Sequence, residues 1–123
     1  MINAIKEKVR ATGQLRGLDG RPIFCRAEHS APNFLLQSAG AILSKRWVVI
    51  GQQLIDEAGL NYDTDYTRCA YVHDEVQLSV VPSEADRVAR LLEAAAPKAG
   101  QYYKFRVPIA ASAGQGKSWQ ETH

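Results

Sequence analysis

The sequence predicts an α+β fold in which helices pack on one face of a small antiparallel sheet. Two patterns carry this prediction. Apolar residues recur every three or four positions over residues 32–58, as expected for a long amphipathic helix. Residues 68–81 contain two β-rich arms around the polar pair Asp74-Glu75, which is typical of a β-hairpin. No linker is long enough to divide two domains, so residues 1–123 are expected to form one domain.

The N-terminal elements are expected to be a helix, a turn and a strand. Apolar residues at helical spacing predict a helix over residues 2–11, which Gly13 can end. The sequence GLDG at residues 17–20 is typical of a turn. It leads into a short predicted strand over residues 22–25.

The long helix is expected to form the spine of the fold. Pro32 suits a first helical turn, and Gly59 is a natural C-terminal cap. A helix over residues 32–58 would be roughly 40 Å long at 1.5 Å per residue.

The C-terminal part of the chain is expected to hold a second helix and a last strand. Ser83 and Asp86 have the spacing of a capping box at the start of that helix. Pro97 and Gly100 are expected to end the helix, and residues 107–110 are expected to form an edge-type strand.

The composition is that of a globular domain, with 46 % hydrophobic and 23 % charged residues among 123. The longest aliphatic or aromatic run, residues 47–50, is far too short to span a membrane. No signal peptide is visible. The two cysteines, Cys25 and Cys69, are too few for a disulfide-stapled secreted scaffold. A cytoplasmic protein with reduced thiols is expected.

The net charge is only +2, but the charges are distributed unevenly. Residues 1–26 hold six Lys or Arg against two acids, and residues 94–123 hold four against one. Residues 56–93 hold nine acids against three basic residues. This pattern fits cations beside a polyanion and carboxylates beside a metal ion, and it also fits ordinary surface charge.

The first candidate site is His73-Asp74-Glu75 at the tip of the predicted hairpin. The strands fix the backbone of such a turn while its side chains stay exposed, which suits a catalytic carboxylate. Adjacent acids point in different directions, so one would bind a metal ion while the other supports it. Asp and Glu are also common turn residues without any such role.

The second candidate site is a polar edge formed by His29, Asn33 and Gln37, which are spaced four residues apart. Near-helical structure over this segment would align the three side chains. Gly40 and Ser44 continue the edge with small residues. Donors beside small residues suit the minor groove of DNA, although capping and solvent exposure also explain them.

A structural zinc site is a further alternative, because Cys25 and His29 share their spacing with Cys69 and His73. If Cys69 and His73 lie on one strand, they are roughly 13 Å apart. Zinc ligands lie within about 2.3 Å of the ion. A shared ion therefore requires a different local structure.

Taken in order, these segments resemble the C-terminal part of the palm of a family A (polymerase I-like) DNA polymerase. The resemblance is closest to the replicative polymerases of short-tailed phages. It rests on residues 16–21 (RGLDGR), 29–41 (HSAPNFLLQSAGA), 70–76 (AYVHDEV) and 118–123 (SWQETH). It covers about residues 16–123, and the combination of segments is highly specific. It implies a single partial domain, in which a catalytic-type hairpin packs against a long helix and a second helix.

The resemblance implies roles for the hairpin residues in two-metal nucleotidyl transfer. Asp74 matches the aspartate of the family's third conserved motif, one of two carboxylates that hold the two catalytic Mg²⁺ ions. Glu75 matches a supporting acid near the metals, and His73 matches a histidine beside the primer terminus. In the complete enzyme, Mg²⁺ would lower the pKa of the primer 3′-hydroxyl and stabilise the leaving pyrophosphate.

The resemblance also implies contacts with the DNA primer–template. Asn33 and Gln37 match polar residues that touch its minor groove. His29 stands where bacterial relatives usually have arginine. His123 matches a histidine that commonly ends these polymerases, so a genuine C-terminus is expected.

Several parts of a family A polymerase are missing from the sequence. The first conserved motif with the other metal-binding aspartate is absent, as are the fingers helix that grips the dNTP, the thumb and the exonuclease. The isolated chain is therefore expected to be inactive. The upstream palm, fingers and thumb are expected partners within a complete DNA-directed DNA polymerase.

Three interpretations stay open. The chain is either a polymerase palm fragment or a non-catalytic nucleic-acid-binding module derived from one, and structural zinc is a weaker third possibility. An excised palm piece would also leave apolar surface open, so self-association into dimers or larger species is expected.

Overall fold

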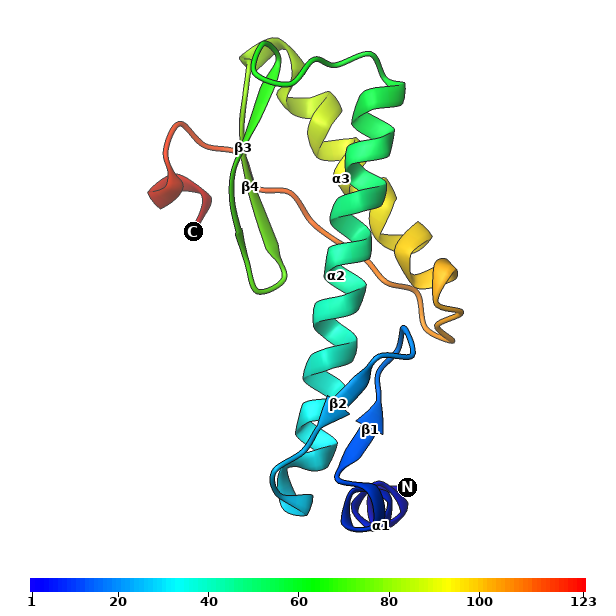
Figure 1. Ribbon diagram of the computed structural model, residues 1–123. Helices are drawn as coiled ribbons and strands as arrows, with labels where there is room; N and C mark the ends of the chain where they lie inside the picture. Colours follow the sequence, from blue (N-terminus) through cyan, green and yellow to red (C-terminus); the bar gives the residue numbers. More distant parts are fainter. The chain divides into compact units, whose positions relative to one another are not determined.

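The computed structural model describes residues 1–123 as helices and two small antiparallel ladders (Figure 1). The helices are α1 (Ile2–Thr12), α2 (Ala31–Glu57) and α3 (Ala85–Tyr102). The strands are β1 (Gln14–Arg16), β2 (Pro22–Phe24), β3 (Tyr66–Val72) and β4 (Glu75–Val80). Short 3₁₀ turns are η1 (Glu28–Ser30), η2 (Pro82–Glu84) and η3 (Trp119–Thr122). The predicted α+β class is confirmed, with two ladders in place of one sheet.

The chain divides into two compact units, residues 1–43 and residues 44–123, and α2 contributes to both. No helix is long and apolar enough to cross a membrane.

In the first unit, α1 and the β1–β2 hairpin pack around a small apolar core. Gly13 ends α1 as predicted: its φ of 69° is left-handed, and its N–H donates to the carbonyl of Val9. The strand β1, which sequence reasoning missed, pairs with β2 so that Leu15 lies opposite Ile23. Its inward-facing side chains join a core made of Val9, Leu15, Cys25 and Ala31, with Ile5, Ile23 and Leu35 against it.

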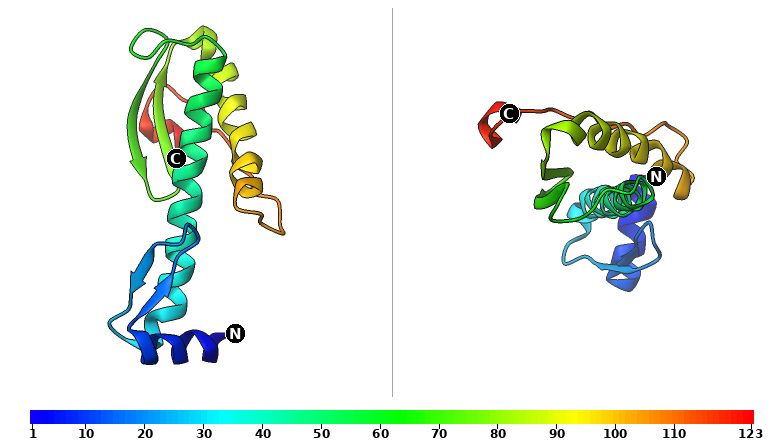
Figure 2. Two further views of the ribbon diagram at one scale, coloured as in Figure 1. Left: turned by 45° about the vertical axis from the view of Figure 1, so that its right-hand side comes forward. Right: turned by 90° about the horizontal axis from the view of Figure 1, so that it is seen from above.

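In the second unit, the β3–β4 hairpin and α3 lie on different sides of the C-terminal half of α2 (Figure 2). Ile55, Leu60, Tyr66 and Val88 form the buried core. The indole N–H of Trp47 on α2 donates to the carbonyl of Leu92 on α3 at 2.7 Å. These contacts fix α2 as the support for the hairpin.

Residues 107–110 do not form the predicted edge strand. Pro108 lacks the N–H that a ladder requires. Ile109 instead lies against Gly100 of α3, where an added β-carbon would be 2.7 Å from Ile109 Cγ1. Further on, the N–H of Ala113 donates to the Glu93 carboxylate at 2.9 Å. This segment therefore packs along α3 and does not join a sheet.

The start and end of α3 also differ from the prediction. No side-chain capping bond forms, because Ser83 lies within the 3₁₀ turn η2 that precedes the helix. The helix also continues through Pro97 to Tyr102. Small buried residues on both sides of Pro97 (Ala95, Ala96, Ala99 and Gly100) pack against the rest of the unit and hold the helix together.

Substitution of Gly100 by alanine is expected to lower the free energy of unfolding by about 1 kcal/mol. Overpacking against Ile109 costs about 1–3 kcal/mol, and the gain in helix propensity returns at most about 1 kcal/mol. Gly40→Ala is the matched control, because its added β-carbon has no neighbour within 4 Å. Urea unfolding of both variants tests this, and equal stabilisation of both would contradict the close packing.

Candidate functional site

The tip of the β3–β4 hairpin carries the first predicted site. Val72 pairs with Glu75, so the turn consists of His73 and Asp74. The prediction that Asp74-Glu75 forms the turn was therefore wrong by one residue, since Glu75 is already the first residue of β4. His73 has a positive φ of 55°, which histidine adopts more readily than most residues.

The turn is held to α2 by a residue that sequence reasoning assigned only to a small-residue edge. The buried Ser44 hydroxyl lies 2.6 Å from the Tyr71 hydroxyl and donates to the carbonyl of His73 at 3.5 Å. Either hydroxyl can be the donor in the contact between Ser44 and Tyr71. This chain of hydrogen bonds fixes the backbone of the turn while its side chains stay exposed.

Asp74 is the one acid in the turn whose carboxylate is open. Its side chain is exposed, with no hydrogen bond or ion pair. Carboxylate oxygens are ligands that Mg²⁺ prefers, and this ion is commonly bound by one or two carboxylates together with substrate phosphates. No group of three or more His, Cys, Asp or Glu side chains is placed to hold a metal ion. Asp74 could therefore act only as a single ligand and is not part of a cluster of protein ligands.

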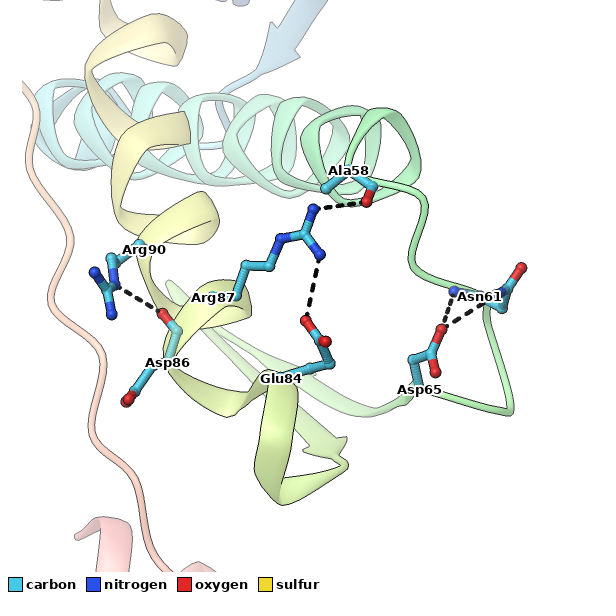
Figure 3. Close-up of polar contacts among 7 residues, drawn as sticks. All are labelled: Ala58, Asn61, Asp65, Glu84, Asp86, Arg87 and Arg90. Carbon is cyan, nitrogen blue, oxygen red and sulfur yellow. Dashed lines mark hydrogen bonds and ion pairs between the residues drawn. The ribbon is translucent and has the colours of Figure 1, made fainter.

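Other acids of this unit are occupied by local contacts (Figure 3). Asp65 accepts hydrogen bonds from the backbone and side-chain nitrogens of Asn61, at 2.7 and 3.2 Å. Glu84 pairs with Arg87 at 3.5 Å, and Arg87 also donates to the carbonyl of Ala58 at 2.8 Å. The bond from Arg87 ties α3 to the residue that follows α2, and the carboxylates of Asp65 and Glu84 are occupied, unlike that of Asp74.

Glu75 is also occupied, by partners from β4 and from the C-terminal turn. The Gln77 amide donates to one carboxylate oxygen, and His123 Nε2 lies 3.0 Å from the other. The hydrogen bond from Gln77, followed by that from His123, holds the pKa of Glu75 below its usual value. Glu75 is therefore a charged anchor for the C-terminal turn.

The C-terminal turn presents His123 to Glu75 through contacts within itself. The imidazole stacks on the indole of Trp119, with ring centroids 5.1 Å apart. Its Nδ1 donates to the carbonyl of Trp119 at 3.1 Å, and this bond, together with the bond to Glu75, raises the pKa of His123. Spacing gave no signal for this contact, because the two residues are 48 positions apart.

The contact between His123 and Glu75 is expected to depend on pH. Because the pKa of His123 is raised in the folded chain, protonated His123 contributes to the stability of the fold. This stabilisation is complete below the pKa of the unfolded chain, about 6.5, and is lost as the pH rises through the pKa of the folded chain. The pKa of Glu75 is lowered in the folded chain, so the stabilisation from its carboxylate is lost only at acidic pH, as the pH falls through the pKa of Glu75 in the folded chain. Titration of the His123 ring protons by NMR should show a midpoint above 6.5 that falls in Glu75→Gln. Asp74→Asn is the control, and an equal fall there would contradict a specific contact.

The second predicted site lies in the first unit. His29 is in η1, and Asn33 and Gln37 follow on α2 four residues apart, so these last two lie on one helix face. All three side chains are exposed, and no hydrogen bond occupies them. Asn33 and Gln37 thus share an exposed helix face, whereas His29 lies before the helix in the 3₁₀ turn.

The two cysteines have different environments. Cys25 is buried in the core of the first unit, whereas Cys69 is exposed on β3, and both are free thiols. His73 follows β3 directly in the turn, so Cys69 and His73 are separated along the strand direction, as the spacing argument assumed.

Comparisons with known proteins place this architecture in a family. The family model for DNA polymerase family A matches residues 4–121. The chain is 35 % identical over 112 residues to the DNA-directed DNA polymerases of Enterobacteria phage T3 and Escherichia phage T7. Each alignment covers 89 % of this chain and 16 % of the phage protein, so the chain spans about a sixth of their length.

A solved structure has the same fold. The POL domain of Pol1 from M. smegmatis, in complex with DNA primer-template and dNTP, superposes with a TM-score of 0.80 at 25 % sequence identity. The match covers 98 % of this chain and 22 % of the solved chain. The predicted resemblance is confirmed. The chain belongs to DNA polymerase family A.

Proposed function

We propose that this chain is the C-terminal part of the palm of a template-directed DNA polymerase, to which it supplies one metal-binding carboxylate and part of the primer–template surface. The observation that carries this proposal is the open carboxylate of Asp74 on a turn that Ser44 fixes to α2. A rigid backbone with a free acid is the arrangement that a metal-dependent phosphoryl transfer requires of its protein ligands.

Asp74 would hold Mg²⁺ together with a carboxylate from the remaining polymerase segment and phosphate oxygens of the dNTP. The chemistry that the bound ions supply is activation of the primer 3′-hydroxyl and stabilisation of the leaving pyrophosphate. Glu75 keeps its negative charge next to Asp74 and anchors His123, so its role is support rather than direct ligation. His73 faces solvent from the same turn, where a primer terminus could reach it.

The exposed edge of His29, Asn33 and Gln37 would contact the minor groove of the primer–template. Asn and Gln amides donate hydrogen bonds, and the minor groove presents acceptors at every base pair regardless of sequence. Such contacts position a duplex without reading its sequence, which is what a polymerase needs.

The chain alone would not extend a primer, because it contributes one carboxylate and no group to grip a triphosphate. The upstream palm, fingers and thumb would supply these, in the cytoplasm of a bacterium or a phage-infected host. Exposed apolar side chains would pack on those segments, or on a second copy in their absence. They include Leu36, Val107 and Trp119.

A metal titration of the chain tests the role of Asp74 without any need for activity. Mn²⁺ in place of Mg²⁺ is expected to broaden the backbone NMR signals of His73, Asp74 and Glu75 first. Asp74→Asn should abolish this selective broadening and leave the signals of β3 and β4 otherwise unchanged. Broadening centred on Asp63, or identical broadening in Asp74→Asn, would contradict the proposal. Duplex binding that survives EDTA and Asp74→Asn would then favour a non-catalytic binding module.

A further inference from the structure

The outward face of the β1–β2 hairpin is a surface with no covering element. Alternation along the strands turns Leu15 and Ile23 into the core of the first unit. Gln14 and Phe24 form an opposed pair on the other face, next to Arg16. Phe24 is 77 % exposed, which is unusual for an aromatic side chain on a strand.

Two arginines of the first unit have no partner: Arg16 on β1 and Arg26, two residues after Phe24. The unit has three acids: Glu28 pairs with Arg10 at 2.7 Å, Asp19 pairs with Arg21, and Glu7 is exposed on α1. Arg16 and Arg26 are exposed, and neither has a hydrogen bond or an ion pair. Guanidinium groups without a partner in the chain can bind an anion from outside it. Their planar arrangement of donors matches the oxygens of a phosphate group.

We propose that Arg16, Arg26 and Phe24 bind single-stranded DNA, in the form of the unpaired template overhang of a primer–template. This inference deepens the proposed function and rests on it. The arginines would contact backbone phosphates, and the ring of Phe24 would stack on an unpaired base. A duplex hides the faces of its bases within the stack except at its two ends, so away from the ends an exposed ring can stack only where a base is unpaired.

The test is fluorescence anisotropy of the full chain with labelled DNA at several salt concentrations. The probes are a primer–template with an overhang and a blunt duplex of the same paired sequence. Arg16→Gln/Arg26→Gln is expected to reduce the slope of log affinity against log salt by about 1.4, at about 0.7 per single-strand phosphate. The matched control Lys6→Gln/Lys8→Gln removes the same charge from α1 and should change the slope much less.

The role of Phe24 is tested by two variants, one that keeps an apolar side chain without an aromatic ring and one that keeps the ring. Phe24→Leu is expected to weaken binding of the overhang DNA about 10-fold or more, whereas Phe24→Tyr should restore it. Neither variant should alter binding of the blunt duplex. Circular dichroism should be unchanged, because the side chain lies outside the core.

The outcomes separate this inference from the proposed function. Binding by the wild-type chain with unchanged slope and affinity in the variants would overturn the hairpin surface alone. Equal loss on overhang and blunt DNA in Phe24→Leu would overturn stacking on an unpaired base. No binding of either DNA by the wild-type chain would contradict the proposed function as well.

Discussion

Asp74→Ala in the assembled polymerase is expected to reduce the rate of primer extension by about 1,000-fold or more. Asp74 is the proposed ligand of a metal ion, and a bound metal ion contributes several kcal/mol to the stabilisation of transition-state charge. Each 1.36 kcal/mol is a factor of ten in rate. The fold should be unaffected, because the Asp74 side chain is exposed and has no partner. The measurement is single-turnover primer extension with Mg²⁺, accompanied by circular dichroism.

Two control variants make this prediction specific. Glu57→Ala removes an equally exposed acid at the end of α2 and should leave the extension rate unchanged. Glu75→Gln removes the anchor of His123 and should lower the rate less than Asp74→Ala. A rate for Asp74→Ala close to that of Glu57→Ala would remove Asp74 from the mechanism.

Ile55→Ala is expected to lower the free energy of unfolding by about 2–5 kcal/mol. Ile55 is 1 % exposed and lies in the core that α2 shares with β3 and α3. Its truncation removes buried methyl groups and leaves a cavity that this tightly packed region can only partly fill. The free energy of unfolding of a domain is about 5–15 kcal/mol, so this one substitution removes a large part of the stability.

Val49→Ala on the same helix is the matched control, because Val49 is 46 % exposed. Its effect should stay within about 0.5 kcal/mol. Denaturant unfolding followed by tryptophan fluorescence measures the stability of both variants, since Trp47 of α2 contacts α3. Similar midpoints for the two variants would show that Ile55 is not the centre of this core.

Local sequence signals predicted the elements well where a few neighbouring residues determine the structure. The periodicity over residues 32–58 gave α2 to within a residue at each end, and Gly13 marked the end of α1. The turn was displaced by one residue because Val72 and Glu75 pair, a register that composition alone does not fix.

Contacts between distant segments could not be predicted from local signals. Proline at residue 97 argues against a helix, yet buried alanines on both sides carry α3 through it. Residues 107–110 have strand-like composition but pack on Gly100 of α3. These outcomes depend on which surface each segment meets after folding.

The candidate site shows the same division. The exposure of Asp74 follows from its place in a polar turn, and the exposed edge at Asn33 and Gln37 follows from spacing. The supports of the hairpin do not follow from any pattern: Ser44 is 29 residues from His73. The role of each site residue came from the family resemblance rather than from spacing.

The most direct test of the account is primer extension by complementation. The chain is assayed with Mg²⁺ alone, and again mixed with a polypeptide that contains the upstream palm, fingers and thumb of a family A polymerase. We expect no extension by the chain alone, extension by the mixture, and loss of that extension with Asp74→Ala. Extension by the pure chain, or a mixture whose activity survives Asp74→Ala, would contradict the claim that this chain supplies one catalytic carboxylate to a larger polymerase.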